Sequence, residues 1–411
     1  MKKCIVFCIA TGIIFLHAQK NCSFKLGLEN IPNNFAYQLR KKGIKSVGLI
    51  TNQTGIDQVG NRNIDLLLER GIPLTYIFAP EHGIQGTITM EKEVTDTVDA
   101  KTKLPVISLY GKYTGKNFDL AIVKEIDLFI FDIQDIGMRH YTYISTLLEL
   151  LKMAEQHNKS VVVFDRPNPL GARMEGPVVE SDLISFISAA AIPLRHGMTV
   201  GELARYFNRF VLEKPVRLLV VPMKYYTRSS CMRMLIAGLS PNVQNIGSCR
   251  GYSFLGLLAE VRPFDVAIGT DKAFQCILLD DELAFGQEKW EILSTQLKRS
   301  GIDSTFYRYF SSRKKKHYSG LRLSIPDINR VRSFDVFISV IQFFKNNGVT
   351  IHFSREFDKA IGIKKVRTLF SQDTNTCTSF SQLIQETKNG VRAFAQRAQP
   401  SYLYKPRPIV G

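Results

Sequence analysis

The sequence predicts an α/β protein: a Rossmann-like N-terminal domain with a mostly parallel sheet, followed by a smaller α+β C-terminal domain. Short runs rich in Val, Ile, Leu and Phe recur between residues 43 and 223, and a helical pattern often follows them. Most runs are continuous rather than alternating, which is typical of strands buried on both faces of a parallel sheet. After about residue 227 this alternation of apolar runs and helical patterns stops. A chain of 411 residues is long enough for two domains.

Each predicted strand is an apolar run that ends in polar or glycine residues. The runs span residues 46–51, 74–78, 105–109, 128–132, 161–165 and 217–221. Helices are expected at 63–70, 141–157 and 199–211, where Thr199 and Glu202 form the capping-box pattern that begins a helix. The C-terminal part is expected to hold a strand at 275–279 and helices at 334–346 and 380–396.

The first residues have the pattern of a secretory signal peptide. Lys2 and Lys3 precede an apolar run over residues 4–16, and Ala18 offers a small residue for cleavage. The run is too short for a good membrane span, although an uncleaved anchor stays open because Leu16 stands where a smaller residue is usual. We therefore expect a signal peptide at 1–18, a catalytic domain at 25–228, a C-terminal domain at 229–411, and a periplasmic or extracellular protein without stable membrane insertion.

Motifs for cofactors and metals are missing. Two of the seven cysteines lie within residues 1–18, and the remaining five are scattered without a C-x-x-C pair, which argues against a disulfide framework. Neither G-x-G-x-x-G nor a P-loop follows the first strand, and no G-x-S-x-G elbow occurs. No H-E-x-x-H or paired histidine spacing supports a metal site. We expect neither a cofactor nor a metal.

The chain is strongly basic. It has 54 Lys and Arg against 37 Asp and Glu, a formal net charge of +17. Such a charge favours anionic partners such as nucleic acid, an acidic membrane or cell-wall polymer. No basic–aromatic interleaving or nucleic-acid motif accompanies it, so nucleic acid is not the expected partner.

Polar side chains follow five of the predicted strands. Parallel strands end at one edge of a sheet, where ligands bind, so these side chains are expected to gather there. Glu81, held in a Pro-Glu-His-Gly turn, suits a general acid, and Asp132 and Asp135 would divide acid and stabilising roles with it. The alternative is structural: Glu81 and Asp132 would cap helices, and Asp135 would pair with Arg139.

Several ordered motifs resemble the peptidoglycan exo-β-N-acetylmuramidase family. The similar stretches are LITNQTG at 49–55, PEHG at 80–83, FDIQDIG at 131–137, YTYIST at 141–146, DRPNP at 165–169, HGMT at 196–199 and SPN at 240–242. The resemblance runs from about residue 26 to residue 404. Because the motifs are many and occur in order, family membership is highly specific.

The resemblance implies a cleft between two domains and release of N-acetylmuramic acid from non-reducing ends of peptidoglycan fragments, without a metal or cofactor. The partners would be muramic acid glycans derived from peptidoglycan. It implies that Glu81 is the principal catalytic carboxylate, with Asp132 and Asp135 beside it. Substrate-binding residues carried over by motif are Asn52, His82, Arg139, Tyr141, Asn168 and His196.

The sequence departs from the family pattern in its second half. The family usually carries Glu-Gly-Thr and then Gly-Arg-Gly-Thr, where this chain reads AEVR at 259–262 and AIGTD at 267–271. Ile268 cannot bind an anion as an arginine would. A non-catalytic peptidoglycan-binding paralogue is therefore the alternative function.

Overall fold

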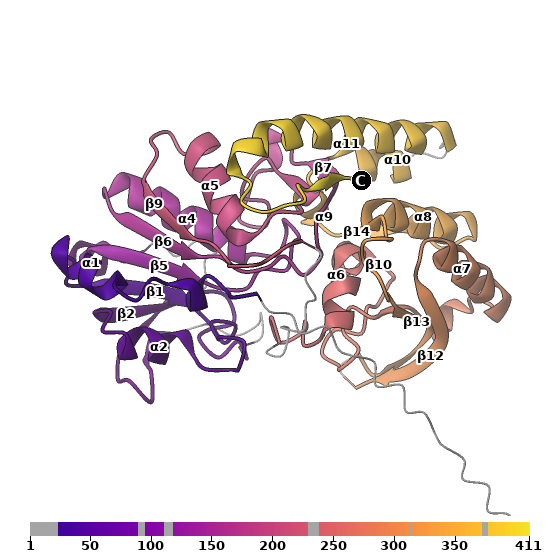
Figure 1. The fold of residues 1–411 in the computed structure, drawn as a ribbon. Helices are drawn as coiled ribbons and strands as arrows, with labels where there is room; N and C mark the ends of the chain where they lie inside the picture. The colour runs from indigo at the N-terminus through magenta and orange to yellow at the C-terminus, as the bar shows by residue number, and fades with distance from the viewer. Residues whose placement is uncertain (1–23, 89–94, 111–117, 229–237, 313, 372–376) are drawn as a thin grey trace, which may run out of the picture.

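The computed structural model describes residues 24–88, 95–110, 118–228, 238–312, 314–371 and 377–411 (Figure 1). The N-terminal region is built on a seven-stranded sheet, and a second region of helices and antiparallel strands lies beside it. The predicted α/β fold class is confirmed. The predicted signal peptide at 1–18 lies outside the described residues.

The central sheet has the strand order β3-β4-β2-β1-β5-β6-β9, and all neighbours except β3 and β4 are parallel. Its strands are β1 (Val47–Thr51), β2 (Leu74–Ala79), β3 (Thr97–Val98), β4 (Pro105–Ser108), β5 (Leu128–Asp132), β6 (Ser160–Phe164) and β9 (Arg217–Val221). The order reverses at β1, because the chain first extends to one side through β2 and later to the other through β5. Ligands bind at such switch points in open α/β sheets.

Both faces of the sheet are buried. On β5, Phe129 and Phe131 belong to one hydrophobic core, whereas Leu128 and Ile130 belong to another. The first core includes residues of α3 (Leu120–Glu125), α4 (Tyr143–Gln156) and α5 (Val200–Phe210), and the second those of α1 (Phe35–Lys41) and α2 (Asn63–Glu69). Two-sided burial explains the continuous apolar runs. The capping box at Thr199 is present, since its hydroxyl accepts from the Glu202 N–H and its N–H donates to the Glu202 carboxylate.

The second region packs helices on a three-stranded antiparallel sheet of order β11-β13-β12. Its elements are α6 (Ile246–Leu258), β10 (Val261–Arg262), β11 (Cys276–Asp280), α7 (Gln287–Arg299), β12 (Asp303–Ser311), β13 (Lys316–Ser324), α8 (Ser333–Asn346), β14 (His352–Phe353), α9 (Phe357–Ile361) and α10 (Lys365–Ser371). Buried side chains of α6 and α8 belong to the same hydrophobic core as α4. The two regions therefore share one core.

The end of the chain returns to the N-terminal region. Helix α11 (Cys377–Ala398) crosses above both regions in Figure 1 and packs on β7 (Arg173–Val178). Strand β15 (Ile409–Val410) pairs with β7, whose other neighbour is β8 (Pro193–Arg195). The Tyr404 hydroxyl donates to Asp165 Oδ2 at 2.6 Å and accepts from the Met223 N–H at 2.8 Å. The last described residues of the chain therefore pack against the N-terminal region.

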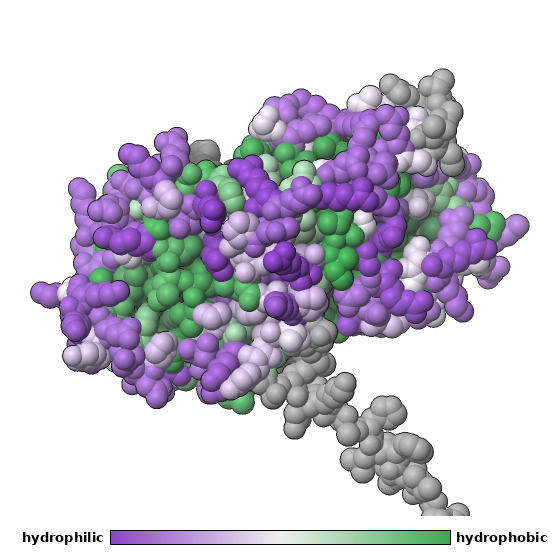
Figure 2. Space-filling model, turned by 45° about the horizontal axis from the view of Figure 1, so that its top comes forward, coloured by the Kyte–Doolittle hydropathy of each residue, from purple (hydrophilic) through white to green (hydrophobic). Residues whose placement is uncertain are grey.

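One face of the molecule is largely hydrophilic. Figure 2 shows a face on which hydrophilic side chains cover most of the area, with hydrophobic ones gathered over the sheet region. None of the described helices has the length and apolar character needed to cross a membrane. The described thiols of Cys249 and Cys276 are buried and unpaired, as expected of small hydrophobic residues.

Tyr404→Phe should lower the free energy of unfolding by about 1–3 kcal/mol, because the buried Asp165 carboxyl loses one of its donors and the buried Met223 N–H loses its acceptor. Chemical denaturation monitored by circular dichroism measures the change. Tyr37→Phe is the matched control, since Tyr37 is 60% exposed. Equal denaturation midpoints for the two variants would contradict the role given to Tyr404.

Candidate active site

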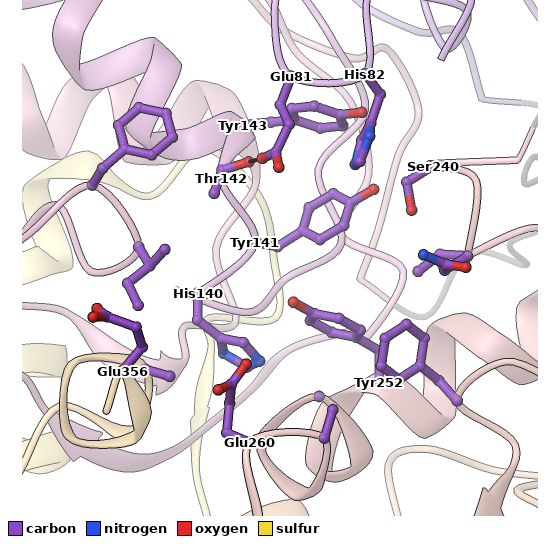
Figure 3. Close-up of a pocket in the computed structure, with 18 of the residues that line it drawn as sticks. Glu81, His82, His140, Tyr141, Thr142, Tyr143, Ser240, Tyr252, Glu260 and Glu356 are labelled. Atoms are coloured by element: carbon purple, nitrogen blue, oxygen red, sulfur yellow. Dashed lines mark hydrogen bonds between the residues drawn. The ribbon is translucent and has the colours of Figure 1, made fainter. Parts of the chain in front are cut away.

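A pocket of about 360 Å³ lies between the carboxyl edge of the sheet and the second region (Figure 3). Its lining comes from both parts of the chain. The N-terminal region contributes Glu81, His82, Tyr110, His140, Tyr141, Thr142, Tyr143, Ser185, Phe186 and Ile187. The second region contributes Ser240, Asn242, Val243, Tyr252, Gly256, Ala259, Glu260, Ile268, Phe274, Glu356, Lys359 and Ala360.

Glu81 is positioned by the turn that follows β2. His82 and Gly83 adopt left-handed backbone conformations, with φ of +72° and +74°, which glycine adopts freely and histidine tolerates better than most residues. His82 Nδ1 lies 2.7 Å from the Ile88 carbonyl oxygen, which fixes the turn. The Glu81 side chain is 9% exposed, and the Thr142 hydroxyl donates to its Oε2 at 2.5 Å. Figure 3 shows this bond at the edge of the pocket.

Tyrosine rings form much of the remaining wall. The ring of Tyr141 lies edge-on to those of Tyr143 and Tyr252, with centroids 5.0 and 5.6 Å away. Burial and the Glu81 charge raise the pKa of Tyr110 to about 12, and burial raises the pKa of Tyr141. These hydroxyls therefore stay protonated at neutral pH. The Tyr141 hydroxyl is buried without a regular hydrogen bond among the described residues, and the Ser240 side chain, also in the lining, interacts with it.

Three of the residues predicted from the sequence line the pocket: Glu81, His82 and Tyr141. The other six predicted residues are absent from its lining. They are Asn52, Asp132, Asp135, Arg139, Asn168 and His196. Each is buried and bonded to protein groups, so the structure places these six outside the lining, and their role in binding the sugar stays a prediction.

Asp132 is held by an ion pair. Its two carboxylate oxygens accept from Arg166 Nε at 2.6 Å and Nη2 at 2.9 Å, and Oδ2 also accepts from Asn63 at 2.8 Å. Neither Asp132 nor Arg166 is more than 2% exposed. The pair links the ends of β5 and β6 and supports the edge of the sheet.

Asp135 and His196 form a second buried pair. His196 Nδ1 accepts from the Met198 N–H, so the other ring nitrogen carries the proton and donates to Asp135 Oδ2 at 3.2 Å. That carboxylate oxygen also accepts from the Gly137 N–H at 2.7 Å. The pair therefore fixes the loop that leads from β5 to the pocket.

Arg139 is fully buried and faces backbone carbonyls instead of Asp135. Its guanidinium donates to the carbonyl oxygens of Pro177, Ile192, Ala360 and Ile361 and to the Ser188 hydroxyl. These groups belong to both regions, so Arg139 joins them directly behind the pocket.

Asn52 and Asn168 stabilise turns. Asn52 Oδ1 accepts from the Thr54 N–H and hydroxyl, and Asn168 Oδ1 accepts from the Leu170 N–H while its amide donates to the Met198 carbonyl. Gly137 is required beside Asn168, because its φ is +100° and a Cβ there would lie 2.3 Å from Asn168 Oδ1.

The sequence interpretation missed several lining residues. Thr142 stands inside the 141–146 motif and His140 directly before it, but a lone histidine or threonine is usually structural. Tyr252 and Glu260 lie in and just after α6, whose residues are buried almost all round and so show no amphipathic period. In the described part of the chain, no three His, Cys, Asp or Glu side chains gather closely enough to hold a metal ion.

Comparison with known proteins agrees with this architecture. The family profile described as exo-beta-N-acetylmuramidase NamZ, N-terminal, matches residues 47–247. The chain is 32% identical over 389 residues to the peptidoglycan beta-N-acetylmuramidase NamZ of Bacillus subtilis (strain 168), covering 89% of this chain and 90% of that protein.

Two solved structures of DUF1343 family proteins from Bacteroides fragilis NCTC 9343 are similar to this one. The TM-scores are 0.76 and 0.71, at 31% and 25% sequence identity. In both cases the match covers 93% of this chain and 99% of the other. The resemblance found in the sequence motifs is thus confirmed across nearly the whole fold, and the chain belongs to the exo-β-N-acetylmuramidase NamZ family.

Proposed function

We propose that this protein is an exo-acting glycoside hydrolase that releases N-acetylmuramic acid from the non-reducing ends of peptidoglycan fragments. The observation that carries the proposal is Glu81, a carboxylate fixed by Thr142 and the turn after β2, in a pocket walled by tyrosines. The name of the Bacillus subtilis relative, a peptidoglycan beta-N-acetylmuramidase, supports the same reaction class.

The size of the pocket favours action at chain ends. Its volume of about 360 Å³ is near the lower end of the range for small-ligand sites, about 300–1,000 Å³. Such a pocket holds about one sugar unit with its substituents. A single-unit site selects the terminal residue of a glycan.

Glu81 would act as the acid and then the base. As a carboxylic acid it gives a proton to the glycosidic oxygen while the 2-acetamido carbonyl oxygen of the sugar attacks the anomeric carbon. As a carboxylate it then takes a proton from the water that opens the cyclic intermediate. The Tyr141 hydroxyl lines the pocket and would orient the acetamido group, and Asp132 and Asp135 would act indirectly by fixing the loops.

Glu81→Gln should lower turnover of a chromogenic N-acetylmuramide by about 10²-fold or more, because general acid catalysis is typically worth about 10²–10⁴-fold. Its melting temperature should stay close to that of the wild type, since Gln can still accept from Thr142. Glu288→Gln, on the exposed face of α7, is the matched control. Equal rates for Glu81→Gln and wild type would remove Glu81 from the catalytic role.

Turnover of the same muramide by the wild type also distinguishes a hydrolase from the alternative, a non-catalytic glycan-binding protein. A wild-type protein that binds muramic acid glycans in calorimetry but never turns them over would be a glycan-binding paralogue. The altered 267–271 stretch, with Ile268 in the pocket wall, is the observation behind that alternative.

Thr142→Val should lower kcat about 10-fold with a smaller change in KM, because Glu81 loses the donor that holds it in the productive geometry. Thr142→Ser keeps the hydroxyl and should restore most of the activity. Steady-state kinetics of both variants on the same substrate test this. A loss in Thr142→Ser as large as in Thr142→Val would mean that packing of the methyl group matters instead of the hydrogen bond.

We also propose export to the periplasm or the cell exterior, where peptidoglycan lies. Mass spectrometry of the full-length chain expressed in a bacterial host should find a mature N-terminus close to Gln19 in the exported fraction. A protein retaining Met1 in the cytoplasmic fraction would contradict export, and Met1 retained in the membrane fraction would indicate an uncleaved anchor.

A further inference from the structure

The rim of the pocket continues onto a second surface. Ile268 lines the pocket and is 41% exposed, so it stands at the opening. Its neighbour Ala267 is buried in a separate small apolar cluster with Leu278 and Tyr318 of the three-stranded sheet. The loop at 265–270 therefore borders the pocket on one side and one face of this sheet on the other. A ligand that leaves the pocket past Ile268 passes onto that face.

Three tyrosines form a row on this face of the sheet. Tyr307 and Tyr309 lie on the edge strand β12, and Tyr318 lies opposite Tyr309 on β13. The ring centroids of Tyr307 and Tyr309 are 6.1 Å apart with planes 16° from parallel, and those of Tyr309 and Tyr318 are 5.9 Å apart with planes at 31°. Tyr318 is buried, whereas Tyr307 and Tyr309 are half-buried. We call these three residues the tyrosine row.

The tyrosine row is tied to the loop that carries the pocket rim. The Tyr309 hydroxyl donates to Asp265 Oδ1 at 3.0 Å, and the same oxygen accepts from the Ala267 N–H at 2.6 Å. Asp265 Oδ2 accepts from Lys314 Nζ at 2.7 Å, and this ammonium lies 5.2 Å from the centroid of the Tyr318 ring. The rings and the loop are therefore held in place relative to each other. A surface that is ordered in advance loses little side-chain freedom when it binds.

The core of the second region lies on the other face of the sheet. Trp290 and Leu293 of α7 share the main hydrophobic core with Leu321 of β13, whereas the tyrosine row belongs to the separate small cluster. Neighbouring residues of a strand point to opposite faces, so the row turns away from α7. Contiguous apolar surface that stays partly exposed marks a contact site for ligands or partners.

Aromatic rings in a row suit a chain of pyranose rings. The C–H groups of a pyranose form an apolar face, and their slightly positive hydrogens match the negative face of an aromatic ring. The pocket itself holds about one sugar unit, so the rest of a glycan must lie outside it. The tyrosine row adjoins the loop at the pocket opening, where this part of the glycan emerges.

We propose that the tyrosine row binds the glycan chain that extends from the terminal N-acetylmuramic acid held in the pocket, by stacking of its pyranose rings on Tyr307 and Tyr309. The row is then a second subsite, for the sugars on the reducing-end side of the cleaved bond. This inference rests on the proposed muramidase function and adds how the leaving part of the substrate is held.

The test compares a chromogenic N-acetylmuramide, which reaches only the pocket, with a tetrasaccharide of alternating N-acetylmuramic acid and N-acetylglucosamine that begins with N-acetylmuramic acid. Release of the chromophore and of free N-acetylmuramic acid gives the two rates. Tyr307→Ala should lower kcat/KM for the tetrasaccharide about 10-fold, through a higher KM, and leave that for the muramide unchanged. Tyr307→Phe keeps the ring and should match the wild type on both substrates.

Phe310→Ala is the matched control. Phe310 is an aromatic residue of the same strand that is 52% exposed, and it points to the opposite face from Tyr309. Its removal should change neither rate. Tyr307→Thr is a second variant in case Tyr307→Ala does not fold, because threonine suits an edge strand and also lacks a ring. It should show the same loss, confined to the tetrasaccharide.

Two results would overturn the inference and leave the muramidase function standing. An equal loss on both substrates would mean that Tyr307 acts only on the fold or on the pocket loop. An unchanged kcat/KM for the tetrasaccharide would mean that the tyrosine row does not hold the glycan.

If the wild type turns over neither substrate, the hydrolase proposal fails on its own. Calorimetry with the tetrasaccharide and with N-acetylmuramic acid then tests the tyrosine row. Binding of the tetrasaccharide that weakens about 10-fold in Tyr307→Ala, with unchanged binding of the single sugar, supports the inference. Equal tetrasaccharide affinities of wild type and variant, or no binding by the wild type, contradict it.

Discussion

The pocket depends on one buried cation, the Arg139 guanidinium. Its Nη1 donates to Pro177 and Ile192 carbonyl oxygens at 2.7 and 2.8 Å, and its Nη2 to that of Ile361 at 2.7 Å. No carboxylate pairs with it among the described residues, so backbone carbonyl dipoles and the Ser188 hydroxyl together stabilise the buried charge. These carbonyls belong to the β7–β8 segment and to α9. The loop that follows Arg139 and helix α9 line opposite sides of the pocket. The Arg139 side chain bonds to α9, so it fixes the distance between these two sides.

Prediction from the sequence worked best for elements whose burial leaves a regular run of apolar residues along the chain. Six of the seven strands of the sheet were predictable from their apolar runs, whereas the short, exposed β3 was not. Glu81 was predictable because it comes just after the end of β2. The direction of each side chain was not predictable. Asp132 turns to Arg166, which comes 34 positions later, and only the folded chain shows that this partner is near. The pocket-lining residues of the second region were not predicted. Helix α6 is buried almost throughout, so its sequence lacks the alternation of polar and apolar faces that marks an amphipathic helix.

The charge of the whole chain and the charge of the pocket have opposite signs. The sequence carries a formal net charge of +17, but the described pocket lining holds more carboxylates than cations. The two act over different ranges. A net charge draws an anionic polymer toward the protein over roughly a Debye length, about 10 Å at 0.1 M salt. Inside the pocket, individual hydrogen bonds and nearby carboxylates act on a ligand at contact distance. Long-range attraction and selection within the pocket are thus separable properties of this chain.

The C-terminal end of the chain packs on the N-terminal region, and this limits the order in which contacts form during folding. Strand β15 and Tyr404 complete contacts to β7 and Asp165, which are encoded more than 200 residues earlier. The early region therefore cannot reach its final state while the chain is still being made, since its last partners are synthesised at the end. Contacts between residues so far apart in the sequence slow folding, and they leave strand edges unpaired until the chain is complete. Until the last residues exist, β7 has an unpaired edge and Asp165 lacks its tyrosine donor, so the first region stays less stable than it is in the finished fold.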